Sequence, residues 1–149
     1  MGSSASKGRR GEQEVARILY KAWFGVEPSK EREFFVRVGF GRKQPYGDLI
    51  VPPDFPFIVE VKNINFDLQQ ITPATLQSII KNKANLPVAV FLKLNHKWWV
   101  VVVEKGTPPD GFWHIHTPNW SATLYPLKVF VSILADVKQR GALKSDAAQ

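Results

Sequence analysis

Two apolar runs near the middle of the chain, in PVAVFLKLNHKWWVVVVE at residues 87–104, constrain the fold more than any other feature. Each run is rich in β-branched and aromatic residues and is far too short to span a membrane, so each predicts a buried strand. The polar residues between the two runs predict a hairpin turn. Strands this apolar need cover on both faces, so helices are expected on each side of the sheet.

Helices are indicated both before and after this hairpin. The first is predicted over residues 11–24, where apolar residues recur at steps of three and four. A second begins at Thr72-Pro73, an N-cap followed by proline at the first helical position, and a third opens at Pro126. Further strands are predicted at 33–38, 47–51 and 57–63, with an edge strand at 111–116. The order α-β-β-β-α-β-β with a trailing helix predicts an α/β fold, a mixed central β-sheet flanked by helices.

Length and composition predict one domain over residues 1–149, because the 149-residue chain is 44% apolar and shows no repeat or linker. Cysteine is absent, which removes disulfides, thiolate zinc sites and a cysteine nucleophile. The start of the chain lacks the apolar core of a signal peptide, and no membrane association is expected. A cytoplasmic protein is the simplest interpretation, or one in the host cytoplasm if the source is viral.

The chain is basic, with 20 Lys and Arg against 13 Asp and Glu and a net charge of +7. Such a charge suits a polyanion, most often nucleic acid, and a basic protein without such a partner is the alternative. The loop at 39–44 is interpreted either as a phosphate-contacting segment or as a solvated loop. The predicted DNA contacts are the clustered cations Lys7, Arg9, Arg10, Arg37, Arg42, Lys43, Lys81 and Lys83.

Three ionisable residues interrupt the apolar stretch GDLIVPPDFPFIVEVKN, residues 47–63. Side chains two apart in a strand point the same way, so Glu60 and Lys62 share one face. A turn through the prolines at 52–56 brings Asp48 across from Glu60 or nearby. Neighbouring carboxylates raise each other's pKa unless a cation neutralises them, and Mg²⁺ or Mn²⁺ suits an all-oxygen site. The alternative is a salt bridge on an edge strand.

Glu12 is a third acid expected at the same place. It lies three residues before Val15 and seven before Leu19, which puts it on the sheet-facing side of the first helix. An acid on this side suggests a cation or a polar site. The alternative is an acid in the first helical turn that the helix dipole favours.

These groups suit metal-dependent cleavage of a phosphodiester. The predicted ligands are Asp48, Glu60, the Val61 backbone carbonyl and Glu12, the last directly or through water. A bound ion polarises the phosphate and lowers the pKa of a water molecule. Lys62 orients that water or stabilises the charge that develops on the phosphoryl group.

An Asp followed by a turn and a Glu-Val-Lys strand, within α-β-β-β-α-β, resembles the PD-(D/E)xK nuclease superfamily. The closer likeness is to the archaeal-type Holliday junction resolvases. In KGRRGEQEVARIL, residues 7–19, Glu12 stands in the place of their early catalytic Glu. Asp48 matches their metal-binding Asp, and LQSIIKNKANLPVAVFL, residues 76–92, matches their helix leading into an apolar strand. Gly47 stands where the superfamily name has Pro.

The resemblance implies a function for the whole chain. It covers about residues 7–104, leaving 105–149 as a C-terminal extension of a single nuclease domain. It implies a Mg²⁺-dependent homodimer that resolves four-way DNA junctions by paired cuts, as in recombination and repair. The catalytic residues it implies are Glu12, Asp48, Glu60 and Lys62.

Other interpretations stay open. A PD-(D/E)xK nuclease could nick or restrict other DNA, and a binding module could keep the fold without cleavage. The acids could instead be salt-bridged structural residues of a basic binding protein. His114 and His116 are metal ligands or, more simply, surface residues. The indoles Trp98, Trp99 and Trp113 either stack on bases of a single strand or pack in a core or dimer.

Overall fold

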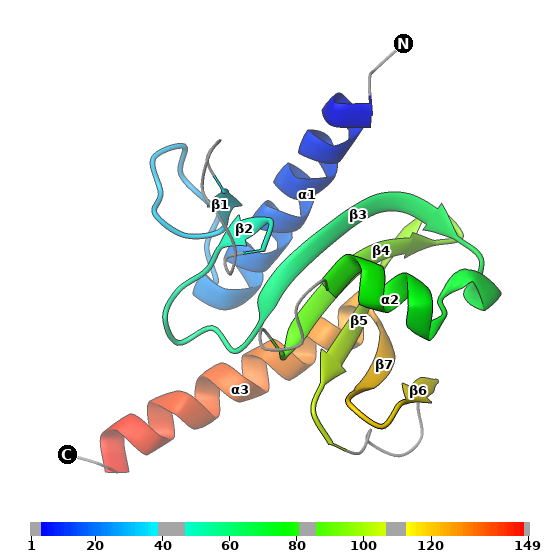
Figure 1. The fold of residues 1–149 in the computed structure, drawn as a ribbon. Coiled ribbons are helices and arrows are strands. Elements are labelled where there is room, and N and C mark those ends of the chain that lie inside the picture. The colour runs from blue at the N-terminus through cyan, green and yellow to red at the C-terminus, as the bar shows by residue number, and fades with distance from the viewer. Residues whose placement is uncertain (1–3, 39–46, 81–85, 107–112, 148–149) are drawn as a thin grey trace.

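The computed structural model describes residues 4–38, 47–80, 86–106 and 113–147, and it has an α/β architecture (Figure 1). The first half comprises α1 (Ser4–Phe24), β1 (Val36–Arg37), β2 (Leu49–Ile50), β3 (Ile58–Phe66), a 3-10 turn η1 (Leu68–Gln70) and α2 (Pro73–Ile80). The second half comprises β4 (Val88–Leu94), β5 (Lys97–Glu104), β6 (His114–His116), β7 (Ser121–Pro126) and α3 (Leu127–Ala147). Within these residues, no helix is both long enough and apolar enough to cross a membrane.

The main sheet has five strands in the order β3-β4-β5-β7-β6 and is mixed, as predicted. β3 and β4 are parallel and the other neighbours are antiparallel. The predicted hairpin at 87–104 is confirmed, with Phe91 opposite Val100. Its turn residues Asn95 and His96 both have positive φ, 50° and 64°, as in two-residue turns that match the twist of the strands.

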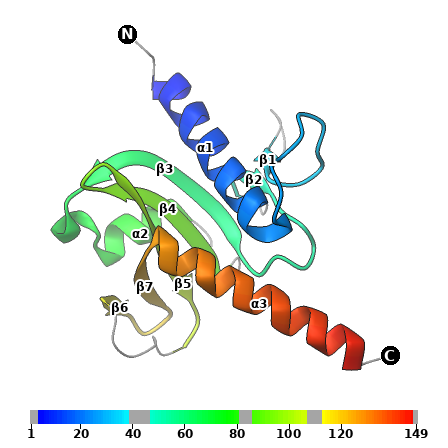
Figure 2. The ribbon, with the colours of Figure 1, turned by 180° about the vertical axis from the view of Figure 1, so that it is seen from behind.

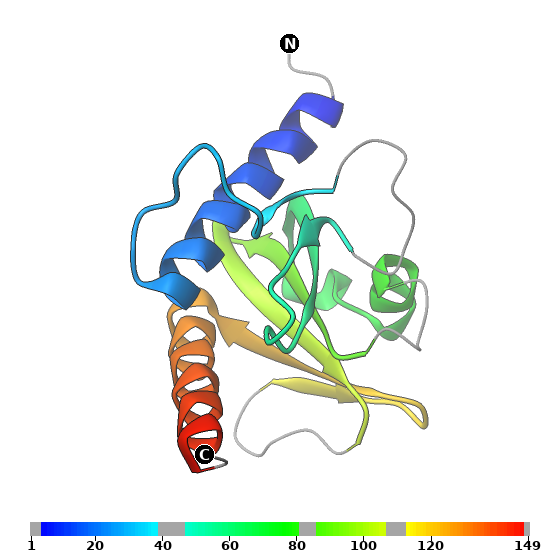
Figure 3. The same cartoon turned by 90° about the vertical axis from the view of Figure 1, so that its left-hand side faces the viewer.

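Helices cover both faces of the sheet, as the apolar strands require. Figure 3 shows α1 and α3 on one side and α2 on the other, and Figure 2 shows α3 in front of the strands. One apolar cluster joins α1 and α3 to the sheet through fully buried side chains such as Leu19, Phe91 and Phe130. A second cluster joins α2 to the opposite face through Leu76 and Val90. β3 therefore lies at the edge of a sheet that is covered on both faces.

α1 begins earlier than predicted, at Ser4 rather than near residue 11. Its first turns are polar and lack apolar side chains at steps of three and four. Contacts with another element, β3, therefore stabilise them. Gly11 lies against β3, where an added Cβ would come 2.6 Å from the Cβ of Asn63. The Asn63 side-chain amide donates a hydrogen bond of 3.0 Å to the Lys7 carbonyl. These contacts fix the start of α1 beside β3.

The predicted strands at 33–38 and 47–51 lie outside the five-stranded sheet, where β1 and β2 form a separate antiparallel pair. Only two residues of the predicted strand at 33–38 are in β1, and Phe35 before it has φ of 55°. The chain from β2 to β3 contains Pro52, Pro53 and Pro56, which lack N–H groups and cannot continue a ladder along β3. Among the described residues, the hydrogen bonds that join this segment to β3 are those of Asp48, just before β2.

A strand that the sequence did not predict, β7, lies between β5 and β6. Ser121 and Thr123 are almost fully buried in it, and this polar content hid the strand pattern. The predicted edge strand β6 and the helix after Pro126 are both present. Residues after 104, interpreted as an extension, thus supply an inner strand and core side chains such as Phe130 and Leu134.

Candidate active site

Asp48 is held against the edge of β3 by hydrogen bonds from both its backbone and its side chain. Its N–H donates to the Val59 carbonyl (2.8 Å), and its Oδ2 accepts from the Val61 N–H (2.7 Å). Its carbonyl accepts a third bond, of 3.2 Å, from the Val38 N–H. Asp48 thus hydrogen-bonds to Val59 and Val61 as a residue of a neighbouring strand would. This places it beside Glu60, as the predicted turn between the two strands requires.

Glu60 and Lys62 lie on one face of β3, and the side chains of Val59 and Val61 pack in the core on the other face. The predicted division of this strand is confirmed. Glu60 is 7% exposed, whereas Lys62 is exposed. No ion pair joins Lys62 to a carboxylate within the described residues, so the salt bridge considered for this strand is not formed there by Lys62.

The predicted catalytic residues all line one cavity of about 310 Å³, which we call the carboxylate cavity. It is enclosed by side chains from α1, from the turn before β2, from β3 and from α2. Its lining residues are Lys7, Gly8, Glu12, Asp48, Glu60, Val61, Lys62, Asn63, Ile64 and Ile79. Its β3 residues belong to an edge strand of the main sheet.

Glu12 reaches the carboxylate cavity with its charge already balanced. Its Oε2 lies 2.6 Å from the Arg37 Nε, and its side chain is 21% exposed. The first turn of α1 contains no acid, and Glu12 lies two turns further on, so the helix-dipole explanation is excluded. Arg37, predicted as a DNA contact, also orients Glu12 in the cavity through this ion pair.

The donors in the carboxylate cavity fit a hard divalent cation. Asp48 and Glu60 provide carboxylates and Val61 a backbone carbonyl, an all-oxygen set of the kind that Mg²⁺ and Mn²⁺ prefer. Within the described residues, no three His, Cys, Asp or Glu side chains are already gathered for a metal ion. Glu12 is paired with Arg37, and a role for Glu12 through water fits this geometry better than direct ligation.

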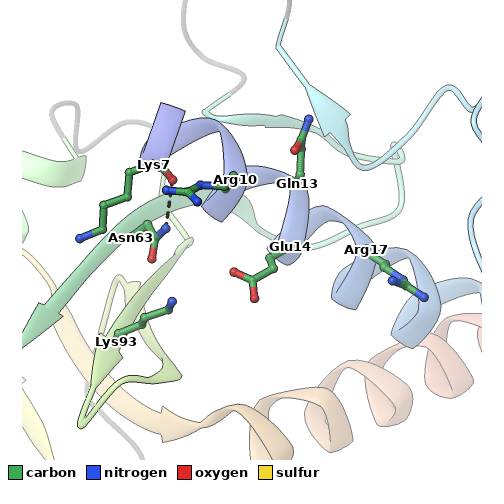
Figure 4. Close-up of a pocket in the computed structure, with 7 residues that line it drawn as sticks. All are labelled: Lys7, Arg10, Gln13, Glu14, Arg17, Asn63 and Lys93. Carbon is green, nitrogen blue, oxygen red and sulfur yellow. Dashed lines mark hydrogen bonds between the residues drawn. The ribbon is translucent and has the colours of Figure 1, made fainter. Parts of the chain in front are cut away.

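A second cavity of about 610 Å³, the basic groove, runs along α1 beside the carboxylate cavity (Figure 4). Lys7 and Asn63 line both cavities, so the two are contiguous. The lining residues of the basic groove are Lys7, Arg10, Gln13, Glu14, Arg17, Asn63 and Lys93. The groove places cations next to the carboxylates, as a phosphate backbone would require.

The sequence predicted some of the cations in the basic groove and missed others. Lys7 and Arg10 were predicted as DNA contacts. Arg17 lies seven residues after Arg10, on the same face of α1, and this spacing was a usable signal. Lys93 interrupts an apolar strand, the same signal that identified Lys62. Arg17 also forms an ion pair of 3.1 Å with Glu27. The pKa of Glu27 is lowered mainly by a hydrogen bond from Lys21 and, second, by one from Arg17.

The remaining predicted contacts are not gathered at these cavities. Arg9 is exposed on α1 and lines neither of them. Arg42, Lys43, Lys81 and Lys83, together with the loop at 39–44, lie outside the described residues.

The structure also shows which of the histidines and tryptophans are exposed and which are buried. His114 and His116 are exposed on the edge strand β6, without a cluster of further metal ligands in the described chain. The indole of Trp120 is buried and donates to Gln77 at 3.1 Å, so it serves the core. Trp98 and Trp99 are half-buried at the start of β5 and line a further groove.

Comparisons with family models, with curated proteins and with solved structures gave no match for this chain. The function is therefore argued from the site.

Proposed function

We propose that this protein is a Mg²⁺-dependent DNA endonuclease of the PD-(D/E)xK type. One observation carries the proposal: Asp48, hydrogen-bonded to Val61, lines one cavity with Glu60 and Lys62. The contiguous basic groove supports a polyanionic substrate.

The roles of the residues follow from their places in the carboxylate cavity. Asp48, Glu60 and the Val61 carbonyl would hold Mg²⁺, or Mn²⁺ in its place. The ion, when bound, supplies Lewis-acid polarisation of the phosphate and a water of lowered pKa. Lys62 places an ammonium beside the phosphoryl group and stabilises its developing negative charge. Glu12, oriented by Arg37, positions water.

The reaction is hydrolysis of a phosphodiester. The oxygen of water forms a bond to phosphorus as the bond from phosphorus to one sugar oxygen breaks. The attacking water loses a proton, and the leaving oxygen gains one from solvent. No residue becomes covalently modified, and the described residues that line the cavity include no serine or cysteine nucleophile.

The proposed substrate is branched DNA, specifically the four-way Holliday junction. A homodimer with two-fold symmetry would cut opposing strands in a pair, as recombination and repair require. Phosphate contacts through Lys7 and Arg10 would make the affinity depend on salt, and the shape of the junction would give selectivity. A place of action in the cytoplasm remains a prediction of the sequence.

A DNA-binding module without cleavage is a second candidate, favoured by two contacts. Glu12 is paired with Arg37, and Asp48 caps an N–H of β3, so both acids also have structural partners. Lys62 supports cleavage instead, because no ion pair with a described carboxylate explains its place beside the cavity.

Cleavage of a labelled four-way junction, beside a linear duplex of the same arms, tests the proposal. Each substrate is incubated with Mg²⁺ or EDTA and with wild type, Glu60→Gln or the control Asp54→Asn, which alters an exposed carboxylate outside the cavity. Paired, metal-dependent cuts in the junction alone, lost only in Glu60→Gln, are expected. Equal cutting of both substrates would keep the nuclease and remove the junction preference. Binding without cutting would favour the DNA-binding module.

A further inference from the structure

A third cavity, of about 730 Å³, lies between the β4–β5 hairpin and the start of α3. We call it the tryptophan groove, because Trp98 and Trp99 form part of its wall. Lys93, Lys97 and Lys128 also line it, and among the described lining residues Glu14 is the one acid. The tryptophan groove thus combines flat apolar surface with a net positive charge.

The three cavities form a series. Lys7 and Asn63 line both the carboxylate cavity and the basic groove. Glu14 and Lys93 line both the basic groove and the tryptophan groove, and Figure 4 shows the two side chains pointing into the same opening. A single extended polymer could therefore pass from the carboxylates, along α1, to the indole of Trp98.

Trp98 is placed to receive a flat ligand. It is half-buried and packs on one side against the core. The Lys93 ammonium lies over its ring, 4.8 Å from the centroid, so a base that stacks on this face must displace the cation. A nucleotide entering here would place its base on the indole and its phosphate beside Lys93.

The charge of the tryptophan groove decides between two occupants. In a two-fold dimer through this groove, each patch would meet its own copy, and lysines would face lysines. An unpaired polynucleotide offers phosphates to the lysines and exposed bases to the Trp98 indole, whereas a duplex hides its bases. Trp99 follows Trp98 in β5, and its side chain packs in the apolar cluster on the opposite face of the sheet. Single-stranded nucleic acid therefore matches both features of the groove.

We infer that the tryptophan groove binds unpaired nucleotides of the strand that enters the carboxylate cavity. Among four-way junctions, one that carries a single-stranded segment next to the cut should then bind more tightly than a fully paired one. This inference rests on the proposed nuclease function for the identity of the strand, but the binding itself needs neither metal nor cleavage.

Binding of a fluorescein-labelled oligothymidylate, followed by anisotropy in EDTA, tests the groove directly. Trp98→Leu keeps an apolar side chain against the core and removes the stacking surface; it should weaken binding roughly 5- to 150-fold. The affinity of a duplex for this variant should stay unchanged. Circular dichroism checks that the variant is folded.

A second variant keeps the test valid if Trp98→Leu does not fold. Lys97 and Lys128 are exposed, and the double variant Lys97→Ala/Lys128→Ala leaves the core intact. The slope of log K against log salt should become shallower by about 1.4, since each phosphate contact on a single strand contributes about 0.7. The matched control Lys30→Ala/Lys105→Ala changes exposed lysines that line none of the three cavities and should bind as wild type does.

Each outcome separates the groove from the nuclease. Oligothymidylate binding that depends on the groove, without cleavage of any DNA, would support the groove and overturn the proposed function. Cleavage of a four-way junction, with oligothymidylate binding unchanged in both groove variants, would overturn the groove alone. A wild-type dimer that sediments as a monomer in Trp98→Leu would assign the groove to a second copy of the chain and also overturn the inference.

Discussion

The position of Asp48 depends on the glycine before it. Gly47 has φ of 68°, and a Cβ there would lie 2.5 Å from the Val59 carbonyl oxygen. That oxygen accepts the Asp48 N–H, so a side chain at 47 would push Asp48 away from β3. A glycine at position 47 thus has a local structural reason in this chain.

Gly47→Ala should therefore destabilise the fold by more than about 1 kcal/mol and lower cleavage, because alanine disfavours positive φ and its Cβ meets backbone. Urea unfolding and the junction assay measure both effects. The control is Gly141→Ala in α3, where a Cβ meets nothing within 4 Å. Alanine there should stabilise the helix by up to about 1 kcal/mol. Unchanged stability of Gly47→Ala would show that β2 and β3 are not held together as described.

Lys62 allows a sharper separation of catalysis from stability. It is exposed and forms no ion pair with a described carboxylate, so Lys62→Ala should leave the midpoint of unfolding unchanged. Loss of one preorganised charge beside the phosphate should lower kcat about 10²- to 10³-fold. Lys105→Ala serves as the control at an exposed site away from the cavities. A fall in stability with kcat unaltered would assign Lys62 a structural role.

At the residue scale, the sequence predicted the members of the site whose signal is local. Asp48, Glu60 and Lys62 interrupt apolar strands, and the two-residue period assigns their faces. The pairing of Glu12 with Arg37 joins residues 25 positions apart, and it depends on where α1 meets β1. No local pattern contains that contact.

At the scale of helices and strands, local signals were again predictable from the sequence and contacts between distant residues were not. The β4–β5 hairpin was predicted because its apolar runs and turn lie within 18 residues of sequence. The early start of α1 was missed because Gly11 and Asn63, on different elements, support it. β7 was missed because its buried Ser121 and Thr123 contradict the usual apolar pattern of an inner strand.

α3 should matter to the fold as much as α1. Phe130 is fully buried, and its ring meets that of Phe91 edge-on with centroids 5.6 Å apart. Phe130→Ala should cost about 3–5 kcal/mol of unfolding free energy, measured by chemical denaturation. Val26→Ala, at a position that is 59% exposed, is the control and should change stability by less than about 0.5 kcal/mol. If both variants changed the free energy of unfolding by a small and equal amount, residues 105–149 would be an extension that the fold does not need.

At the scale of the whole molecule, Glu104 makes stability depend on pH. Burial raises its pKa above the ordinary value of 4.5, so the folded state holds this proton more tightly than the unfolded state. Below pH 4.5 the Glu104 carboxyl is protonated in both the folded and the unfolded state, so its burial does not lower the free energy of unfolding. As pH rises from there through the raised pKa, the unfolded chain ionises first and stability falls.

Glu104→Gln should remove this loss and flatten stability above pH 4.5, measured by thermal unfolding across pH. Glu31→Gln, at an exposed glutamate, is the control and should retain the wild-type profile. A profile that is the same in Glu104→Gln and in wild type would show that another group controls this region of pH.

Metal binding should couple the carboxylate cavity to the stability of the whole chain. An ion that binds the folded state alone stabilises it by about 2.7 kcal/mol at one hundred times its Kd. Asp48, on the turn before β2, and Glu60, on β3, would both ligate it, so the ion would join segments whose direct hydrogen bonds in the structure are few. Thermal unfolding with increasing Mn²⁺ should therefore show a rising midpoint for wild type and for the control Asp54→Asn. Glu60→Gln removes one carboxylate and should lose most of the rise. A wild-type midpoint indifferent to Mn²⁺ would instead make the acids structural partners of β3 and Arg37, and the protein a binding module rather than a nuclease.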